Sequence, residues 1–312
     1  MQLLLGSYKQ GLYSLTINKQ TSKFENLTQI NDREKTSYLN SDNLLSYIYL
    51  KDEQYYINIE TEDVTLYHSA THLSYLESQN AMLVSFYNNG LFKVLRKRPN
   101  WRISEQFSYP KGSHIHYSSY IPNTNLIGVV DLGLNKIYFY NNITPLNLNQ
   151  VYDFDEGIGP RHFINNLDLP IIYVLTEHIP MVIVLMYENG IWQEVAKYPL
   201  EKGAGSAIRV TSDNKHLFAA VRDSNKIYHF NILKDGTLKF VNSYDTLGDH
   251  PRDFNIFLDK YLVIANMKSD NLTLYVLEDN QLILKESNFK ANAIAAIISK
   301  WWLFFLLINN YF

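Results

Sequence analysis

The stretch HIHYSSYIPNTNLIGVVDLGLNKIYFYN, residues 114–141, decides the fold because variants of it recur along the chain. Its pattern is a polar residue before an apolar one, a polar turn, an apolar run, a turn of Asp, Ser or Asn, and an alternating strand. Clear copies occupy 160–187, 207–232 and 251–278, and weaker copies occupy 36–59 and 71–95. Repeats of about 40 to 45 residues are typical of four-stranded propeller blades.

A column of polar side chains marks the first strand of these copies. His116, His162, Arg209 and Asp253 are 46, 47 and 44 residues apart, and His72 lies 44 residues before His116. Because the innermost strand of each propeller blade faces the channel, we expect His72, His116, His162 and Arg209 to form a ring around the axis.

The N-terminal segment supplies one more blade. Residues 6–18 resemble the middle of a blade, and residues 24–30 its outer strand. Helical periodicity is not sustained anywhere between residues 1 and 290, and a sandwich would not repeat one polar signature at constant spacing. The sequence predicts an all-β protein, a seven-bladed β-propeller with four-stranded blades.

Composition limits the partners of the chain. Its 312 residues carry a net charge of −3, so no basic field attracts nucleic acid, and we expect no nucleic-acid partner. It has no cysteine, which excludes disulfides and fits a reducing cytoplasm. The N-terminus MQLLLGSYKQ lacks the basic region and long apolar run of a signal peptide, so we expect a cytoplasmic protein.

In order along the chain, the motifs GSY (6–8), TSYL (36–39), THLS (71–74), FYNNG (86–90), HIH (114–116), GPRH (159–162), SAIR (206–209) and PRDF (251–254) are similar to those of a known family. The chain resembles the lactonase family of seven-bladed propellers, whose best-known activity is that of 6-phosphogluconolactonase and whose relatives include carboxymuconate-lactonizing enzymes. The resemblance implies a metal-free, cofactor-free axial pocket for a lactone with an anionic substituent.

By motif, the resemblance implies His114, His116, Arg161 and Glu177 as catalytic residues. The substrate-binding candidates are His72, His162, Arg209 and Arg252, and the motifs do not decide whether Arg209 or Arg252 contacts the substrate.

General chemistry assigns roles to these residue types. A histidine whose pKa lies near neutral suits a general base, and the planar fork of arginine suits a phosphate or carboxylate, with Arg161 as our first choice. Glu177 acts either as the general acid or as an ion-pair partner of Arg161. Lactone hydrolysis also needs stabilisation of the carbonyl oxyanion.

Structural interpretations of the same residues stay open. The HIH motif puts His114 and His116 on one face of a strand, as a channel site, a metal pair or a polar strand end, and no third ligand has recognisable metal spacing. Arg161, Arg209 and Arg252 each begin a strand, where arginine can bind backbone carbonyls or pair with an aspartate of the neighbouring blade.

The C-terminus departs from the family pattern. Residues 291–308 are nearly apolar and close to the length of a membrane span, but Lys300 lies within them and we expect no membrane contact. Related propellers close the ring with a late strand, and nothing after Ser287 resembles one. We therefore expect a propeller domain over 1–288, an aberrant tail over 289–312 and an incompletely closed ring.

Three functions agree with these observations. The first is a monomeric hydrolase of a sugar-acid lactone, with 6-phosphogluconolactone as first candidate. The second is a propeller that binds a ligand or protein without catalysis, because fold does not determine function. The third is a lactonizing enzyme acting on an unsaturated dicarboxylate.

Overall fold

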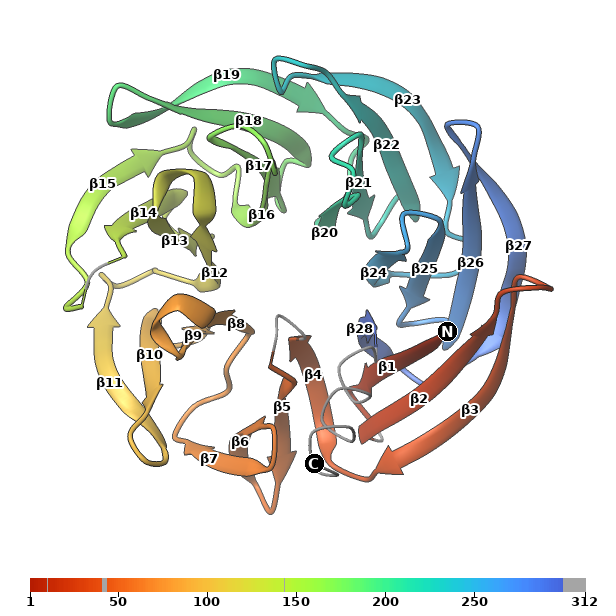
Figure 1. Cartoon of the computed structure of the whole chain (residues 1–312), viewed down its shortest axis with the longest axis horizontal. Coiled ribbons are helices and arrows are strands. Elements are labelled where there is room, and N and C mark those ends of the chain that lie inside the picture. Colours follow the sequence, from red (N-terminus) through yellow and green to blue (C-terminus); the bar gives the residue numbers. More distant parts are fainter. Residues whose placement is uncertain (10, 41–43, 143, 300–312) are drawn as a thin grey trace, which may run out of the picture.

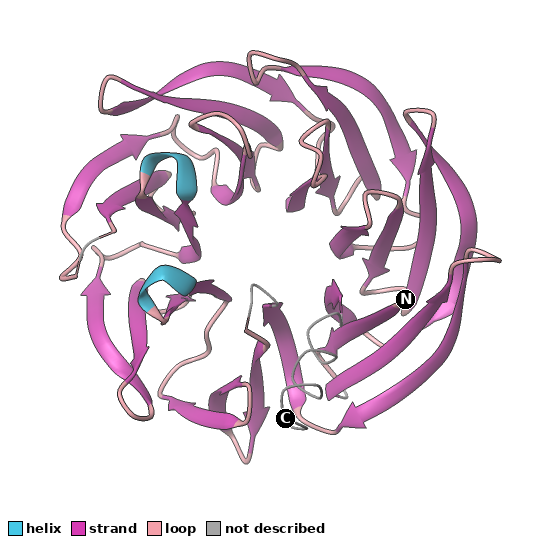
Figure 2. Ribbon diagram, viewed as in Figure 1, coloured by secondary structure: helices cyan, strands magenta, loops and turns pink. Residues whose placement is uncertain are grey.

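The computed structural model describes residues 1–9, 11–40, 44–142 and 144–299. Their strands form seven four-stranded antiparallel sheets arranged in a ring (Figure 1, Figure 2). The described residues contain no α-helix, and their two short 3-10 helices are η1 (Glu77–Gln79) and η2 (Pro122–Thr124). The predicted seven-bladed β-propeller is confirmed.

We number the blades in chain order and give the innermost strand of each first. Blade 1 consists of β28 (Ile294–Ser299), β1 (Gln2–Ser7), β2 (Gly11–Asn18) and β3 (Lys23–Asn31). Blade 2 consists of β4 (Glu34–Asn40), β5 (Ser46–Lys51), β6 (Gln54–Ile59) and β7 (Glu62–Leu66). Blade 3 consists of β8 (His72–Leu76), β9 (Ala81–Phe86), β10 (Leu91–Lys97) and β11 (Trp101–Ser108).

The remaining blades follow the same plan. Blade 4 consists of β12 (Ile115–Ile121), β13 (Leu126–Asp131), β14 (Lys136–Asn141) and β15 (Leu148–Asp153). Blade 5 consists of β16 (Pro160–Asn165), β17 (Ile171–Thr176), β18 (Met181–Glu188) and β19 (Ile191–Pro199). Blade 6 consists of β20 (Gly205–Val210), β21 (His216–Val221), β22 (Lys226–Ile232) and β23 (Leu238–Asp245). Blade 7 consists of β24 (Pro251–Phe257), β25 (Tyr261–Asn266), β26 (Asn271–Glu278) and β27 (Gln281–Lys290).

Burial explains why the sequence shows short apolar runs. A middle strand packs against the neighbouring blades on both faces, so all six residues of β17, IIYVLT, are buried. An outer strand such as β19 covers the blade on one side only and mixes buried with exposed positions. A strand buried on both faces has a continuous apolar sequence, whereas a half-exposed strand does not.

The hydrophobic core lies between the blades rather than at the axis. Each apolar cluster joins two adjacent blades, such as blades 4 and 5 around Phe139 and Trp192, whose rings stack 4.9 Å apart. Blades 7 and 1 are joined by Leu15, Phe24 and Val263, among others. The polar residues of the inner strands are thereby left for the axis.

The expectation of an incompletely closed ring is wrong. β28 pairs antiparallel with β1, with Leu4 opposite Ile298, and is the innermost strand of blade 1 (Figure 1). Ile297 packs toward blade 7 and Ile298 toward blade 2, so this closing strand is buried on both faces and shows no alternation. The propeller therefore extends past residue 288, and residues 300–312 of the predicted tail lie outside the described residues.

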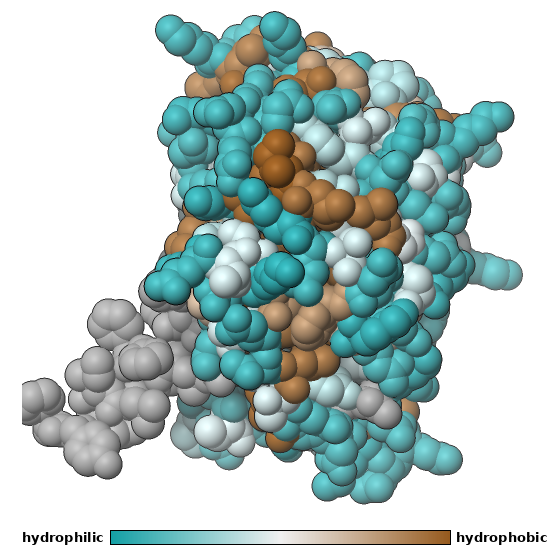
Figure 3. All heavy atoms as spheres, turned by 90° about the vertical axis from the view of Figure 1, so that its right-hand side faces the viewer, coloured by the Kyte–Doolittle hydropathy of each residue, from teal (hydrophilic) through white to brown (hydrophobic). Residues whose placement is uncertain are grey.

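The outer surface seen in Figure 3 is mostly hydrophilic, with groups of apolar residues between hydrophilic ones. Outer strands carry some exposed apolar side chains, such as Ile283 and Leu284 of β27, which are 42% and 45% exposed. No helix within the described ranges is long and apolar enough to cross a membrane.

Candidate active site

A cavity of about 260 Å³ opens at one end of the propeller axis. The charged and imidazole groups that line it are His116, Glu177, Arg222 and Arg252. Its neutral polar side chains are Tyr8, Ser37, Ser69, Thr71, Tyr87 and Asn88. The first set comes from blades 4 to 7 and the second from blades 1 to 3, so one wall is charged and the other carries mainly hydroxyl groups.

β-bulges set the direction of three side chains at this end of the inner strands. In β12 the pairing passes from Ile115 to Tyr117 and leaves His116 as the extra residue. Arg161 has the same place in β16, and Arg252 in β24. A bulge re-aims its extra residue away from the regular alternation, which turns these side chains toward the axis.

Two other charged residues follow the second strands of their blades. Glu177 comes directly after β17, and Arg222 comes directly after β21. A Cβ atom on Gly205, at the start of β20, would lie 2.1 Å from the carbonyl oxygen of Thr176. Only glycine allows this close approach, which brings blade 6 against blade 5 beside Glu177.

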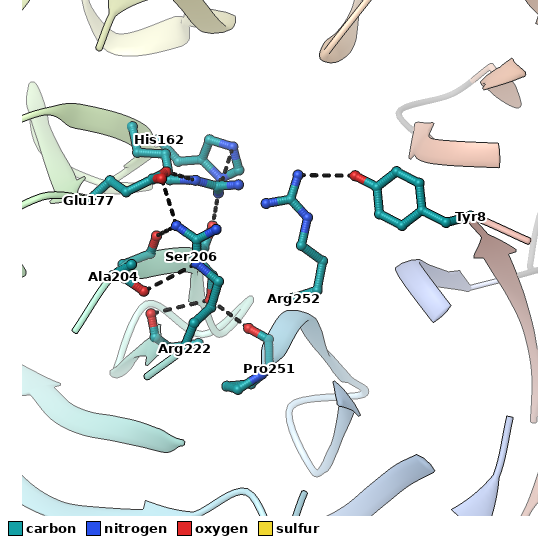
Figure 4. Close-up of polar contacts among 11 residues, drawn as sticks. Tyr8, His162, Glu177, Ala204, Ser206, Arg222, Pro251 and Arg252 are labelled. Carbon is teal, nitrogen blue, oxygen red and sulfur yellow. Dashed lines mark hydrogen bonds and ion pairs between the residues drawn. The ribbon is translucent and has the colours of Figure 1, made fainter. Parts of the chain in front are cut away.

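Glu177 binds two guanidinium groups at once (Figure 4). Its Oε2 accepts a hydrogen bond from Nε of Arg161 at 2.7 Å, and its Oε1 lies 2.7 Å from Nη2 of Arg222. Arg161 is buried and also donates from Nη1 to the carbonyl oxygen of Ser206. Two positive charges therefore share one negative charge.

The charge state of this group follows from its contacts. Burial alone would raise the pKa of Glu177, but Arg161 and Arg222 together bring it below its ordinary value. Burial and the nearby Arg252 lower the pKa of Arg161 to about 9, so Arg161 stays protonated at neutral pH. An ionised Glu177 has no proton to donate, so the geometry favours its role as ion-pair partner over that of general acid.

Three buried histidines lie at the axis. The ring centroids of His116 and His162 are 5.0 Å apart, and those of His72 and His162 are 6.0 Å apart. Burial, with a smaller contribution from the nearby arginines, lowers the pKa of all three well below 6.5, so they are neutral. His116 lines the cavity, whereas His72 and His162 lie outside its lining.

The side chains of the predicted column, His72, His116, His162 and Arg209, do not all lie at one height along the propeller axis. Tyr117, not His116, lies between the other histidines, with ring centroids 4.0 Å from His72 and 5.0 Å from His162. Positions 72, 117 and 162, whose rings lie together, are separated by a constant 45 residues. The prediction instead aligned His72, His116 and His162, which are 44 and 46 residues apart. A shift of one residue along a strand turns the side chain to the opposite face of the strand.

Arg209 lies outside the cavity lining. Its Nη2 forms an ion pair with Oδ1 of Asp253 at 2.7 Å, and Oδ2 of Asp253 accepts a hydrogen bond from the backbone amide of Ile297 at 3.0 Å. This is the pairing with a neighbouring blade's aspartate that the sequence left open. Between Arg209 and Arg252, the structure brings Arg252 to the cavity.

His114 also lies outside the cavity lining. Its ring stacks on that of Tyr87 at 4.3 Å, and its Nδ1 lies 3.1 Å from the carbonyl oxygen of Tyr87. Tyr87 lines the cavity, so His114 contacts a cavity-lining side chain without lining the cavity itself.

Sequence reasoning missed Arg222, Tyr87 and Tyr8. A signal for two of them was present, because Tyr87, Glu177 and Arg222 lie at 87, 177 and 222, which are multiples of 45 residues apart. They share the position after the second strand of a blade, a second column that faces the cavity. Tyr8 ends the GSY motif, directly after β1.

No metal site is evident among the residues that the structure describes, because they contain no group of three His, Cys, Asp or Glu side chains placed to hold an ion. The histidines of the axis lie among cations, where a further positive ion would be repelled.

Comparison with curated proteins finds modest similarity. The 6-phosphogluconolactonase of Bacillus subtilis (strain 168) is 30% identical over 230 residues, which cover 66% of this chain and 66% of that relative. An uncharacterized protein of Lactococcus lactis subsp. cremoris is 32% identical over 200 residues, 60% of this chain and 58% of the relative. The chain thus matches less than two thirds of these relatives' own length.

Comparison with solved structures supports the fold. A Lactobacillus plantarum protein superimposes with a TM-score of 0.87 at 23% identity, covering 95% of this chain and 99% of the other. The periplasmic gluconolactonase of Pseudomonas aeruginosa gives 0.83 at 19% identity, covering 95% and 98%. The profile described as "Lactonase, 7-bladed beta-propeller" matches residues 2–298. The chain therefore belongs to the lactonase family of seven-bladed β-propellers.

Proposed function

We propose that this protein hydrolyses the lactone of a sugar acid that carries an anionic group, with 6-phosphogluconolactone as the first candidate and 6-phosphogluconate as its product. One observation carries the proposal: the neutral imidazole of His116 and the guanidinium of Arg252 line the same small cavity. Family membership and the similarity to the Bacillus enzyme support it.

The anionic group of the substrate would bind Arg252. Within the described part of the chain, Arg252 forms no ion pair, and its Nη2 donates to Oη of Tyr8 at 3.3 Å. Three guanidinium groups, those of Arg161, Arg222 and Arg252, surround a single carboxylate here, so the site has an excess of positive charge. An anion neutralises this excess, and a guanidinium donates two parallel hydrogen bonds to a phosphate or carboxylate.

His116 would act as the general base. It takes a proton from water, the resulting hydroxide adds to the lactone carbonyl, and the ring C–O bond of the tetrahedral intermediate then breaks. The leaving alkoxide recovers the proton from His116, so the imidazole ends neutral. Arg252 and Arg161 lower the pKa of His116 beyond the effect of burial, so a bound anion that offsets their charge makes it a stronger base.

Arg222 would stabilise the oxyanion of the tetrahedral intermediate. It lines the cavity and is held by Glu177 and by the carbonyl oxygens of Ala204 and Gly205. A donor that is fixed before the reaction lowers the barrier because it need not reorganise as charge develops. Glu177 positions this donor through its ion pair.

The opposite wall suits a sugar. Ser37, Ser69, Thr71 and Asn88 line the cavity with small neutral groups that both donate and accept hydrogen bonds. A polyhydroxylated lactone ring matches such a wall, whereas a planar unsaturated dicarboxylate offers few hydroxyl groups to it.

The test is acid release from 6-phosphogluconolactone in a pH-stat, corrected for spontaneous opening. We expect His116→Ala and Arg252→Ala each to lower kcat/KM by about 100-fold or more, the range typical of losing a general base or a charged binding group. Arg102→Ala, which changes an exposed arginine of the outer strand β11, is the matched control and keeps full activity.

Other outcomes would replace the proposal. If the wild-type protein opens no lactone but binds 6-phosphogluconate, the propeller is a ligand-binding module. Interconversion of a muconate-type dicarboxylate and its lactone, with no hydrolysis of sugar lactones, would instead identify a lactonizing enzyme.

A further inference from the structure

Arg252 differs from the other arginines near the axis in the partner that holds it. Arg161 and Arg222 share the Glu177 carboxylate, and Arg209 binds the carboxylate of Asp253. Among the described residues, the hydrogen-bond partner of the Arg252 guanidinium is the neutral phenol oxygen of Tyr8 (Figure 4). A neutral acceptor orients a guanidinium without cancelling its charge.

Tyr8 reaches Arg252 across the seam where the two ends of the chain meet. Tyr8 follows β1 of blade 1, whereas Arg252 lies in β24 of blade 7, 244 residues away (Figure 1). In Figure 4 the hydroxyl of Tyr8 points toward the guanidinium of Arg252, and a dashed line marks their hydrogen bond.

The backbone of Tyr8 is held by residues from both terminal parts of the chain. Its amide donates to the carbonyl oxygen of Ala293 at 3.1 Å, just before the closing strand β28, and its carbonyl accepts from the amide of Lys35 at 3.2 Å. The hydroxyl of the preceding Ser7 donates to the carbonyl oxygen of Asn292 at 2.7 Å. Closing the ring therefore places the phenol at a defined point on the cavity wall.

The phenol has a second capacity that a ligand can use. A tyrosine hydroxyl accepts and donates at the same time, so accepting from Arg252 leaves its own hydrogen available. Tyr8 lines the same cavity as Arg252. An anion beside Arg252 would then receive hydrogen bonds from the guanidinium and from the phenol.

We propose that Tyr8 is a positioning residue that directs Arg252 at the anionic end of the substrate and adds a second donor to that anion. Tyr8 thus selects charged lactones over uncharged ones. This inference rests on the proposed function, in which Arg252 binds the anionic group.

The test compares Tyr8→Phe with the wild-type protein on 6-phosphogluconolactone and on uncharged glucono-1,5-lactone. Removal of a hydrogen bond to a charged group should raise KM for the phosphorylated lactone by about tenfold. The change in kcat should stay within about twofold, and the kinetics on the uncharged lactone should not change, because that substrate has no anion to bind. Tyr120→Phe is the matched control, since its hydroxyl donates to Asn125 at 2.9 Å outside the cavity lining.

Direct binding of inorganic phosphate, measured by calorimetry, keeps this inference separate from the proposed function. We expect weaker phosphate binding to Tyr8→Phe than to the wild type and to Tyr120→Phe, even if no lactone is hydrolysed. Equal KM values and equal phosphate affinities would overturn the inference while leaving hydrolysis intact. An equal loss on charged and uncharged lactones would also overturn it, because that pattern indicates a structural defect.

Discussion

Two arginine and carboxylate groups lie around the same axis, and they differ in the ratio of their charges. At the cavity, Glu177 is shared by Arg161 and Arg222. In the second group Asp253 pairs with the guanidinium of Arg209 and also accepts a hydrogen bond from the backbone amide of Ile297. The two arginines bring the pKa of Glu177 below its ordinary value despite burial, whereas burial raises the pKa of Asp253 although Arg209 is in contact.

This difference in charge balance gives the two groups different capacities: the cavity group can attract an anion, whereas the second group joins blades. The cavity group keeps an unbalanced positive charge that an anionic substrate can neutralise. The second group is balanced, and it joins three blades, because Arg209 lies in β20, Asp253 in β24 and the bound amide of Ile297 in β28. In the proposed function the same residue types bind substrate at the cavity, whereas at Asp253 they join blades 6, 7 and 1.

The largest expected effect comes from removing β28, the strand whose Ile297 amide binds Asp253. A chain that ends after Lys290 lacks β28, including the buried side chains of Ile294, Ile297 and Ile298. Each buried isoleucine contributes about 2 kcal/mol, so the loss is comparable with the whole stability of a domain, about 5 to 15 kcal/mol. We expect a largely unfolded protein, measured by circular dichroism and thermal melting.

The control for this truncation ends after Ser299 and keeps β28. An unchanged melting temperature in the shorter chain would show that β28 does not close the ring.

Removing one charge from each group tests whether the two groups differ in role. Glu177→Gln leaves two adjacent guanidinium groups without their anion and displaces Arg222, so we expect kcat/KM to fall by about 100- to 1000-fold, the usual effect of losing a fixed oxyanion donor. Asp253→Asn should keep kcat/KM within about threefold and lower the free energy of unfolding by about 2 kcal/mol, because it weakens a hydrogen bond to a charged group. Activity assays and urea unfolding of both variants check this, and equal activity losses would erase the distinction between the groups.

The smallest expected effect is the position of the acid limb of kcat/KM. Only neutral His116 accepts a proton, and its lowered pKa keeps it neutral as the pH falls through 6.5. Glu177, whose pKa is also lowered, stays ionised over the same range. The acid limb should therefore lie below pH 6.5 in the wild type and in Asp253→Asn, as measured by kcat/KM against pH on 6-phosphogluconolactone. A limb at or above pH 6.5 would contradict neutral His116 as the base.

Part of the site was predictable because strand position determines which side chains meet. Arg161 and Glu177 are separated by 16 residues within one blade, so the turn between two paired strands brings them together. Arg222 belongs to another blade, and its contact with Glu177 depends on how closely blade 6 approaches blade 5. His114 and His116 alternate in sequence, but the bulge in β12 sends only His116 to the cavity.

The sequence by itself determined the repeat, the number of blades and the candidate arginines, because each blade is a local unit whose turns and apolar runs recur about every 45 residues. Only the tertiary structure decided which arginine faces the cavity, which histidine lines it and how the ring closes. Those features depend on contacts between blades: β28 is recognisable as a strand only beside β1, and Tyr8 approaches Arg252 only after the first and last blades meet.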